Sequence, residues 1–168
     1  MNRGKKMNNR YKDFNKSWLI ENNVHIFLDG VDTFGIDTPL LNVAYKKLEV
    51  YQLMKGKLVF RPLFSNTKPH PKGILKECTY YQVGISCGER GNRKTVGIPI
   101  HRVVYCWFND IIKAYNDEGQ KMEICHNQKF EDIQENNHIT NLRWDTAKAN
   151  RAERGGATNQ YGKLRKKK

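Results

Sequence analysis

Short apolar segments alternate with polar, glycine-containing stretches along most of this chain. Residues 24–28 form a strand-like apolar run, and Asp29-Gly30 directly after it is a turn signal. Residues 79–86 and 93–100 are strand patterns joined by a connection rich in Gly, Arg and Glu, so they predict a β-hairpin. Residues 58–64 predict a further strand, which a proline confines to a sheet edge or a strand end.

Two segments have the pattern of helices. Thr38-Pro39 can cap and start a helix, and apolar side chains then recur at helical spacing as far as Tyr51. We therefore expect a helix from residue 38 to about Met54, packed on the preceding hairpin. A second apolar segment follows His101-Arg102 and contains Val103, Val104, Trp107 and Phe108. It resembles the His-Arg and helix segment that precedes the catalytic unit in many HNH homing endonucleases, and the resemblance implies a helix that extends to about Tyr115.

The C-terminal third of the chain combines strand and helix patterns. An apolar run that contains Ile124 predicts a strand ending at His126, and a polar loop rich in Asn, Asp and Glu follows it. A second short strand pattern contains Trp144, and Thr146 is an expected N-cap for a helix that places Asn150 on its second turn. The predicted order is strand, loop, strand, helix, and the predicted fold class is α+β.

Basic residues are concentrated at the two ends of the chain. Residues 1–17 carry a net charge of +5 and residues 148–168 carry +7, whereas the part between them carries only +1 of the total of +13. Two basic ends on a nearly neutral body suit binding to a phosphate backbone, which is strong and salt-sensitive. The alternative is that both ends are solvated tails that only aid solubility.

The composition narrows the class of protein. The hydrophobic fraction is 38%, no apolar run approaches the length of a membrane span, and no hydrophobic segment follows the N-terminal charges. We therefore expect an intracellular protein that is neither secreted nor membrane-bound. The four cysteines form no CxxC pair, so a structural zinc site is not expected, and they are interpreted as reduced, partly buried thiols.

The stretch from residue 124 to residue 150 carries the most informative motif. Its elements are Cys125-His126, Asn136-Asn137, the run Asn141-Leu142-Arg143-Trp144, Thr146 and Asn150. In this pattern the chain resembles the HNH nucleases, and more closely the HNH homing endonucleases. The resemblance covers residues 101–150 specifically and residues 24–100 only loosely. It implies a ββα-metal nuclease fold in the C-terminal part.

The resemblance also implies roles for individual residues. His126 would activate the attacking water, Asn141 would hold the loop and His126 in place, and Asn150 would bind a divalent metal, Mg²⁺ or Mn²⁺. Cys125 stands where many relatives carry a second, acidic ligand, and a thiol is a soft ligand that suits Mg²⁺ poorly. The loop between His126 and Asn141 is three residues longer than the family spacing implies.

Elementary chemistry is consistent with these roles. Hydrolysis of a phosphodiester needs a deprotonated water and a cation that neutralises charge on the phosphate. A histidine that titrates near neutrality supplies the first, and a hard metal on oxygen ligands supplies the second. The alternative is that His126 and Asn141 only satisfy backbone groups in an irregular loop.

Several basic side chains are candidate nucleic-acid contacts. Two-stranded ribbons fit a DNA major groove, so the predicted hairpin could bind DNA, although it could equally be an ordinary cover for the core. The candidates are Arg90, Arg93 and Lys94 in the hairpin, Arg102 and Arg143 in the C-terminal part, and Lys163, Arg165 and Lys166 in the tail.

We therefore expect four parts: a basic disordered arm at 1–17, an α+β DNA-binding lobe at 18–100, an HNH nuclease motif at 101–154 and a basic tail at 155–168. The expected function is metal-dependent DNA cleavage by a monomer or weak dimer, as in the homing enzymes of mobile elements. One alternative is a nucleic-acid-binding protein that kept the fold and lost the chemistry, such as a ribonucleoprotein component. Another is a nuclease for branched or RNA-containing substrates.

Overall fold

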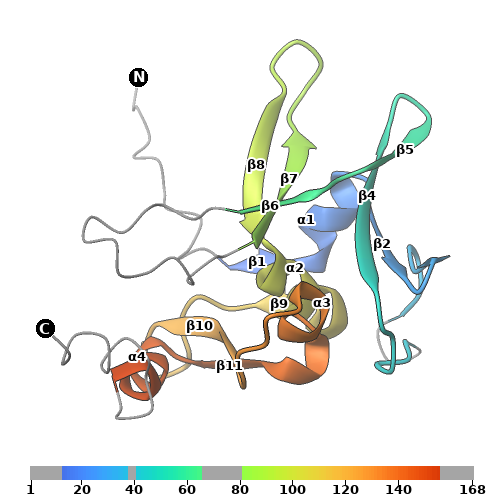
Figure 1. Ribbon diagram of the computed structural model, residues 1–168. Coiled ribbons are helices and arrows are strands. Elements are labelled where there is room, and N and C mark those ends of the chain that lie inside the picture. Colours follow the sequence, from blue (N-terminus) through green and yellow to red (C-terminus); the bar gives the residue numbers. More distant parts are fainter. Residues whose placement is uncertain (1–12, 38–40, 66–80, 156–168) are drawn as a thin grey trace, which may run out of the picture.

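The computed structural model describes residues 13–37, 41–65 and 81–155, and for Arg154 and Gly155 it describes the backbone only. The described part is a mixed α+β structure in which short strands predominate (Figure 1). The predicted fold class is confirmed at this level. The strands are β1 (Phe14–Asn15), β2 (Val24–Leu28), β3 (Val31–Asp32), β4 (Leu48–Met54), β5 (Lys57–Phe60), β6 (Leu63–Ser65), β7 (Tyr81–Cys87), β8 (Lys94–Pro99), β9 (Ile111–Ile112), β10 (Met122–His126) and β11 (Leu142–Thr146). The helices are α1 (Lys16–Glu21), α2 (Ile100–Asn109), α3 (Ile133–Asn136), α4 (Ala147–Gly155) and the 3-10 helix η3 (Ile139–Asn141).

The first sheet has the strand order β3-β2-β4-β5, with antiparallel neighbours. The predicted strand at 24–28 and the turn at Asp29-Gly30 are both confirmed. The helix predicted from residue 38 to Met54 is wrong, because residues 48–54 form β4, and residues 38–40 lie outside the described part. Side chains along β4 alternate between buried and less buried, and Lys55-Gly56 after it has positive φ at both residues, as two-residue hairpin turns require. Strand alternation and turn chemistry therefore outweigh the helical spacing.

The second sheet has the order β6-β7-β8 and contains the predicted hairpin. Its strands begin at Tyr81 and Lys94, and residues 79 and 80 lie outside the described part. The strand predicted at 58–64 is divided between β5 and β6, with Arg61 and Pro62 between them. Figure 1 shows the β4–β5 and β7–β8 hairpins projecting from one end of the molecule, away from β10, β11 and α4.

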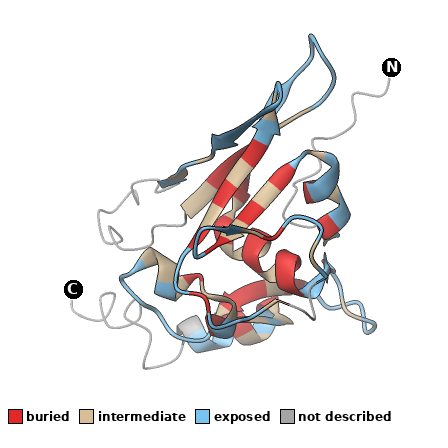
Figure 2. Ribbon diagram, turned by 90° about the vertical axis from the view of Figure 1, so that its right-hand side faces the viewer, coloured by how far each residue is buried: buried red, intermediate tan, exposed pale blue. Residues whose placement is uncertain are grey.

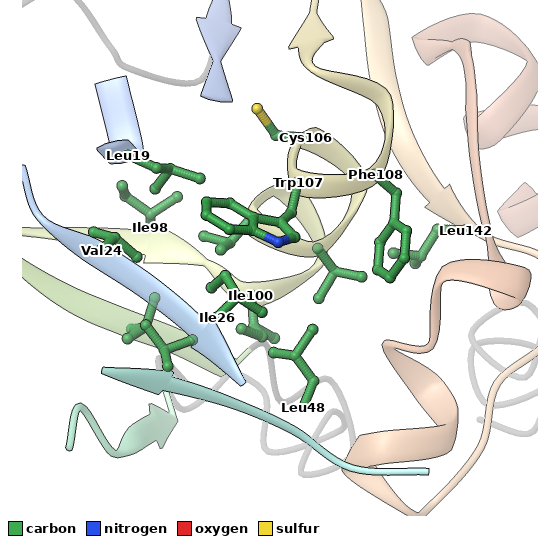
Figure 3. Packing of buried hydrophobic residues seen from close by; sticks show 14 of the residues in the cluster. Leu19, Val24, Ile26, Leu48, Ile98, Ile100, Cys106, Trp107, Phe108 and Leu142 are labelled. Carbon is green, nitrogen blue, oxygen red and sulfur yellow. The ribbon is translucent and has the colours of Figure 1, made fainter. Parts of the chain in front are cut away.

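The hydrophobic core extends across both sheets and the C-terminal elements. Helix α2 lies at its centre, and the Trp107 side chain is fully buried between strands of the lobe and the rest of α2 (Figure 3). Its ring nitrogen donates to the Thr33 hydroxyl at 2.9 Å, and that hydroxyl donates to the Ile26 carbonyl at 2.6 Å. Ile124 and Leu142 belong to the same buried cluster, so the lobe and the C-terminal unit share one core. In Figure 2 the buried residues gather at the centre, and exposed ones mark the projecting strands.

Two boundaries differ from those that the sequence predicted. Residues 14–21 form β1 and α1, and Leu19 is fully buried, so residues 14–17 of the predicted arm belong to the folded part. Helix α2 ends at Asn109 rather than near Tyr115, because Asp110 adopts a positive φ of 70° and the chain continues as β9. Strand β9 pairs with β1, a partner nearly a hundred residues away that local sequence patterns do not reveal.

Candidate functional site

The C-terminal unit consists of two antiparallel strands, β10 and β11, followed by helix α4. The predicted N-cap is confirmed, since the Thr146 hydroxyl accepts a hydrogen bond from the Ala149 N–H at 3.1 Å. Successive side chains of a strand point to opposite faces, so β10 presents Ile124 and His126 to one side and Glu123 and Cys125 to the other. Ile124 packs in the core with α2, whereas Glu123 contacts α4.

His126 ends β10 and is held by Asn137 at the end of α3. The His126 Nε2 atom lies 3.0 Å from the Asn137 side-chain oxygen, and the Asn137 amide nitrogen donates to the Ile133 carbonyl at 3.0 Å. Because the second bond fixes the amide orientation, the oxygen faces the imidazole, and Nε2 is the donor. In the neutral imidazole, Nδ1 therefore carries the lone pair that accepts a proton. The ring of His101, on α2, lies edge-on to His126 at 5.1 Å between centroids.

Asn141 is buried and binds the loop on both sides. Its amide nitrogen donates to the carbonyl oxygens of Gln128 and Asn136 at 2.9 and 2.8 Å, and its side-chain oxygen accepts from the Gln128 N–H at 2.9 Å. The Asn141 carbonyl also accepts from the N–H of Asn127, the residue after His126, at 2.7 Å. Asn141 thus holds the loop, as the resemblance implied, while direct contact with the imidazole belongs to Asn137.

The same loop is anchored to the N-terminal lobe. The His138 ring stacks on Tyr45 at 4.2 Å between centroids, and its Nε2 donates to the Tyr45 carbonyl at 2.8 Å. The Tyr45 hydroxyl accepts from the Ile139 N–H at 3.0 Å, and burial raises the pKa of Tyr45 to about 12 although that hydrogen bond lowers it. Gln134 exchanges two hydrogen bonds with the backbone of Leu48. The polar loop is therefore a fixed part of the structure.

Asn150 is buried on α4 and contacts a carboxylate. Its amide nitrogen lies 2.6 Å from Oε2 of Glu123, which is half-buried on β10. Carboxylate and amide oxygens are hard donors that suit Mg²⁺ or Mn²⁺, so Asn150 fits the metal implied by the resemblance. Cys125 does not fit, because its thiol is soft and only 2% of the residue is exposed.

The described contacts do not bring His126 and Asn150 together. His126 interacts with residues of α2 and α3, whereas Asn150 interacts with Glu123 on the opposite face of β10. Within the described ranges, no group of three or more His, Cys, Asp and Glu side chains could hold a metal ion.

Arg143 is occupied by partners within the C-terminal unit. Its guanidinium donates to Asp145 at 3.1 Å, to Glu153 at 2.6 Å and to the His126 carbonyl at 3.2 Å. Burial lowers the pKa of Arg143, but the hydrogen bonds to Asp145 and Glu153 outweigh that effect and raise it above its usual value. This side chain, predicted to contact phosphate, thus joins β11 to α4 and to the backbone beside Asn127, whose side-chain oxygen it also contacts at 3.0 Å.

The other predicted nucleic-acid contacts have different surroundings. Arg90, Arg93 and Lys94 are exposed at the tip of the β7–β8 hairpin. Arg102 is half-buried on α2, with its guanidinium 5.7 Å from the ring centroid of Phe14. Lys163, Arg165 and Lys166 lie outside the described residues. The hairpin therefore carries the most accessible of these candidates in the described part.

Comparisons with protein-family models, curated proteins and solved structures found no match for this chain. The resemblance to the HNH nucleases therefore rests on the motif residues themselves. Among the helices that the structure describes, none has the length and apolar character needed to span a membrane.

Sequence reasoning assigned no role to two residues of this site. Asn137 was part of the motif, but its bond to His126 depends on the conformation of an eleven-residue loop segment. Glu123 lies three positions before His126 and thus on the same strand face as Cys125. The sequence does contain a signal for Glu123. It is an acidic residue three positions before His126, on the strand face directed toward the helix that carries Asn150.

Proposed function

We propose that this protein is a metal-dependent DNA endonuclease of the HNH homing type. The observation that carries the proposal is the hydrogen bond from His126 Nε2 to an Asn137 amide whose orientation is fixed by Ile133. It assigns the proton to Nε2 and the lone pair to Nδ1, which is the state a general base needs. An orienting group behind the base is the usual arrangement in sites that activate a nucleophile.

Asn150 is the proposed metal ligand on α4. A bound Mg²⁺ or Mn²⁺ would neutralise charge that develops on the scissile phosphate. His126 accepts the proton of the attacking water at Nδ1. Asn137 orients the imidazole, and Asn141 holds the loop that follows His126. Arg143 keeps the end of β10 attached to β11 and α4.

DNA is the proposed partner, and the exposed Arg90, Arg93 and Lys94 support this proposal. The hairpin tips project from the end of the molecule away from β10 and β11 (Figure 1). A duplex that contacts both parts would follow the side of the protein, which suits a long recognition site. The basic segments at the two ends of the sequence add electrostatic affinity.

One observation favours a second function, that of a nucleic-acid-binding protein without catalysis. His126 and Asn150 have their described contacts on opposite faces of β10. A protein that kept the ββα arrangement only as a scaffold would need no convergence of these side chains. Its binding would be tight and salt-sensitive, and it would leave the phosphodiester bonds intact.

Supercoiled plasmid incubated with the purified protein and Mg²⁺ or Mn²⁺ separates the two functions. The nuclease proposal predicts nicked or linear DNA with the wild-type protein. It predicts loss of cleavage by His126→Ala with DNA affinity nearly unchanged. A control variant is His25→Ala, which removes a histidine of β2 that contacts Asp32 and lies outside the C-terminal unit.

The outcomes are distinct. Cleavage by His126→Ala at the wild-type rate would remove His126 from the mechanism. Persistent absence of nicks with every metal, together with tight binding that weakens as salt rises, would favour the binding protein. Preferential cleavage of branched or RNA-containing substrates would indicate a structure-specific nuclease.

A further inference from the structure

Glu123 on β10 and Asn150 on α4 form a short polar contact between these two elements. Glu123 Oε2 and the Asn150 amide nitrogen are 2.6 Å apart, although 27 residues separate the two in the chain. Asn150 is only 7% exposed, and Glu123 is half-buried.

The geometry of this pair matches that of two neighbouring metal ligands. Oxygen ligands that are adjacent around Mg²⁺ lie about 3 Å apart, because each Mg–O distance is about 2.1 Å and the geometry is octahedral. The Glu123–Asn150 contact, at 2.6 Å, is somewhat shorter than that separation, so the two groups would move slightly apart around an ion. Turning the Asn150 amide over about its last side-chain bond would replace the nitrogen by the oxygen without moving the backbone.

Cys125 lies on the same face of β10 and is a poorer donor. Its sulfur is 3.7 Å from the Glu123 carbonyl oxygen and contributes a soft thiol to a buried position. A carboxylate two residues earlier reaches the same helix, since residues 123 and 125 point the same way on a strand. The position before His126 therefore need not supply the acidic ligand.

We infer that Glu123 and Asn150 together form the divalent-cation site of this protein, with Glu123 as the acidic ligand. This inference rests on the proposed metal-dependent function, but it concerns which residues bind the ion and can be tested without cleavage. The site takes Mg²⁺ or Mn²⁺ through two protein oxygens and leaves the other positions to water or a phosphate group. Cys125 contributes packing to this site and no bond to the metal.

Binding of Mn²⁺ alone to the full-length protein, followed by electron paramagnetic resonance, tests the inference. Glu123→Gln should weaken Mn²⁺ binding by at least about tenfold, a loss of the size that disrupted metal sites show. Glu131→Gln removes the same charge from an exposed loop position and should stay within about twofold of wild type, as should Cys125→Ser. Thermal unfolding without metal checks that each variant is folded.

Asn150→Asp provides a test that does not depend on the folding of Glu123→Gln. Two carboxylates that face one ion should bind Mn²⁺ at least as tightly as the wild-type pair does. Added Mn²⁺ should therefore raise the unfolding temperature of Asn150→Asp more than that of wild type, because a ligand that binds only the folded state stabilises it. An unfolding temperature that Mn²⁺ leaves unchanged in Asn150→Asp would contradict the inference.

The remaining outcomes separate this inference from the nuclease proposal. Wild-type affinity in Glu123→Gln, loss of binding in Cys125→Ser, or no Mn²⁺ binding by the wild-type protein would overturn the Glu123–Asn150 site. If Glu123→Gln binds Mn²⁺ as wild type does while wild type cuts plasmid DNA, only the ligand assignment fails. If Mn²⁺ binds through Glu123 and no DNA is cut, the site stands and the nuclease proposal fails.

Discussion

Asn137 Oδ1 accepts a hydrogen bond from His126 Nε2 at 3.0 Å, across a loop that joins the two strands of the C-terminal unit. The Asn137 amide nitrogen is bound in turn to the Ile133 carbonyl, so a short helix of four residues determines the tautomer of the imidazole. An interaction of this kind orients a group that reacts without itself touching the substrate.

Asn137→Ala should therefore reduce cleavage while leaving DNA binding intact. Loss of the acceptor frees the imidazole to rotate and to change tautomer, and we expect kcat to fall by about 10- to 100-fold, as for other orienting partners. Asn137→Asp retains an acceptor for Nε2 and should keep more activity than the alanine variant. Single-turnover cleavage and binding isotherms would measure both effects, and equal kcat values for Asn137→Ala and wild type would show that the bond has no catalytic role.

Tyr45 makes the stability of the protein sensitive to alkaline pH. Burial raises its pKa to about 12, above the ordinary value of 10.0. The folded state thus holds the phenolic proton more tightly than the unfolded state does, so the stabilisation is complete below pH 10.0 and is lost as the pH rises toward about 12. The full effect is about 2–3 kcal/mol, since each unit of pKa difference corresponds to about 1.4 kcal/mol.

Tyr45→Phe should flatten that dependence. The variant also loses the acceptor for the Ile139 N–H, so at neutral pH we expect the free energy of unfolding to fall by about 1–3 kcal/mol. Denaturant unfolding at pH 7, 10 and 11.5 would compare the two proteins. An equally steep loss of stability in Tyr45→Phe between pH 10 and 11.5 would assign the alkaline sensitivity to another group.

Arg143 is expected to act on stability rather than on DNA affinity. Arg143→Ala leaves Asp145 and Glu153 without their shared partner, and we expect a loss of about 1–2 kcal/mol in the free energy of unfolding. Lys148→Ala, an exposed position on α4, is the control and should change stability by less than about 0.5 kcal/mol. Unchanged stability with weakened DNA binding in Arg143→Ala would restore the phosphate contact predicted from the sequence.

The β7–β8 hairpin should supply part of the salt-dependent DNA affinity. Replacing Arg90, Arg93 and Lys94 together by alanine removes three exposed charges. If each contacts one phosphate, the slope of log affinity against log salt concentration should become shallower by about 2.7 units. Lys55 and Lys57, exposed at the end of the neighbouring β4–β5 hairpin, give a control that is compared per charge removed. An equal change in the slope per charge for both sets would indicate a general charge effect and no specific role of β7–β8.

The local features of this fold could be predicted because they depend on neighbouring residues. The strand at 24–28 and its Asp-Gly turn, the β7–β8 hairpin, the strand before His126 and the Thr146 cap follow from alternation, turn residues and capping within a few positions. The helix expected at 38–54 failed for a related reason. Its apolar spacing was compatible with two periods, and pairing of β4 with β2 decided between them.

The sequence by itself determined which residues are candidates for chemistry: His126, Asn141 and Asn150 in one motif, with basic side chains in a hairpin. Only the tertiary structure decided that Asn137 holds the imidazole, that Glu123 faces Asn150, and that Arg143 is occupied within the unit. The position of a residue in a strand determines on which face of the strand its side chain lies. The residues that the side chain contacts there depend on how a distant loop and helix pack, and that packing depends on the whole core.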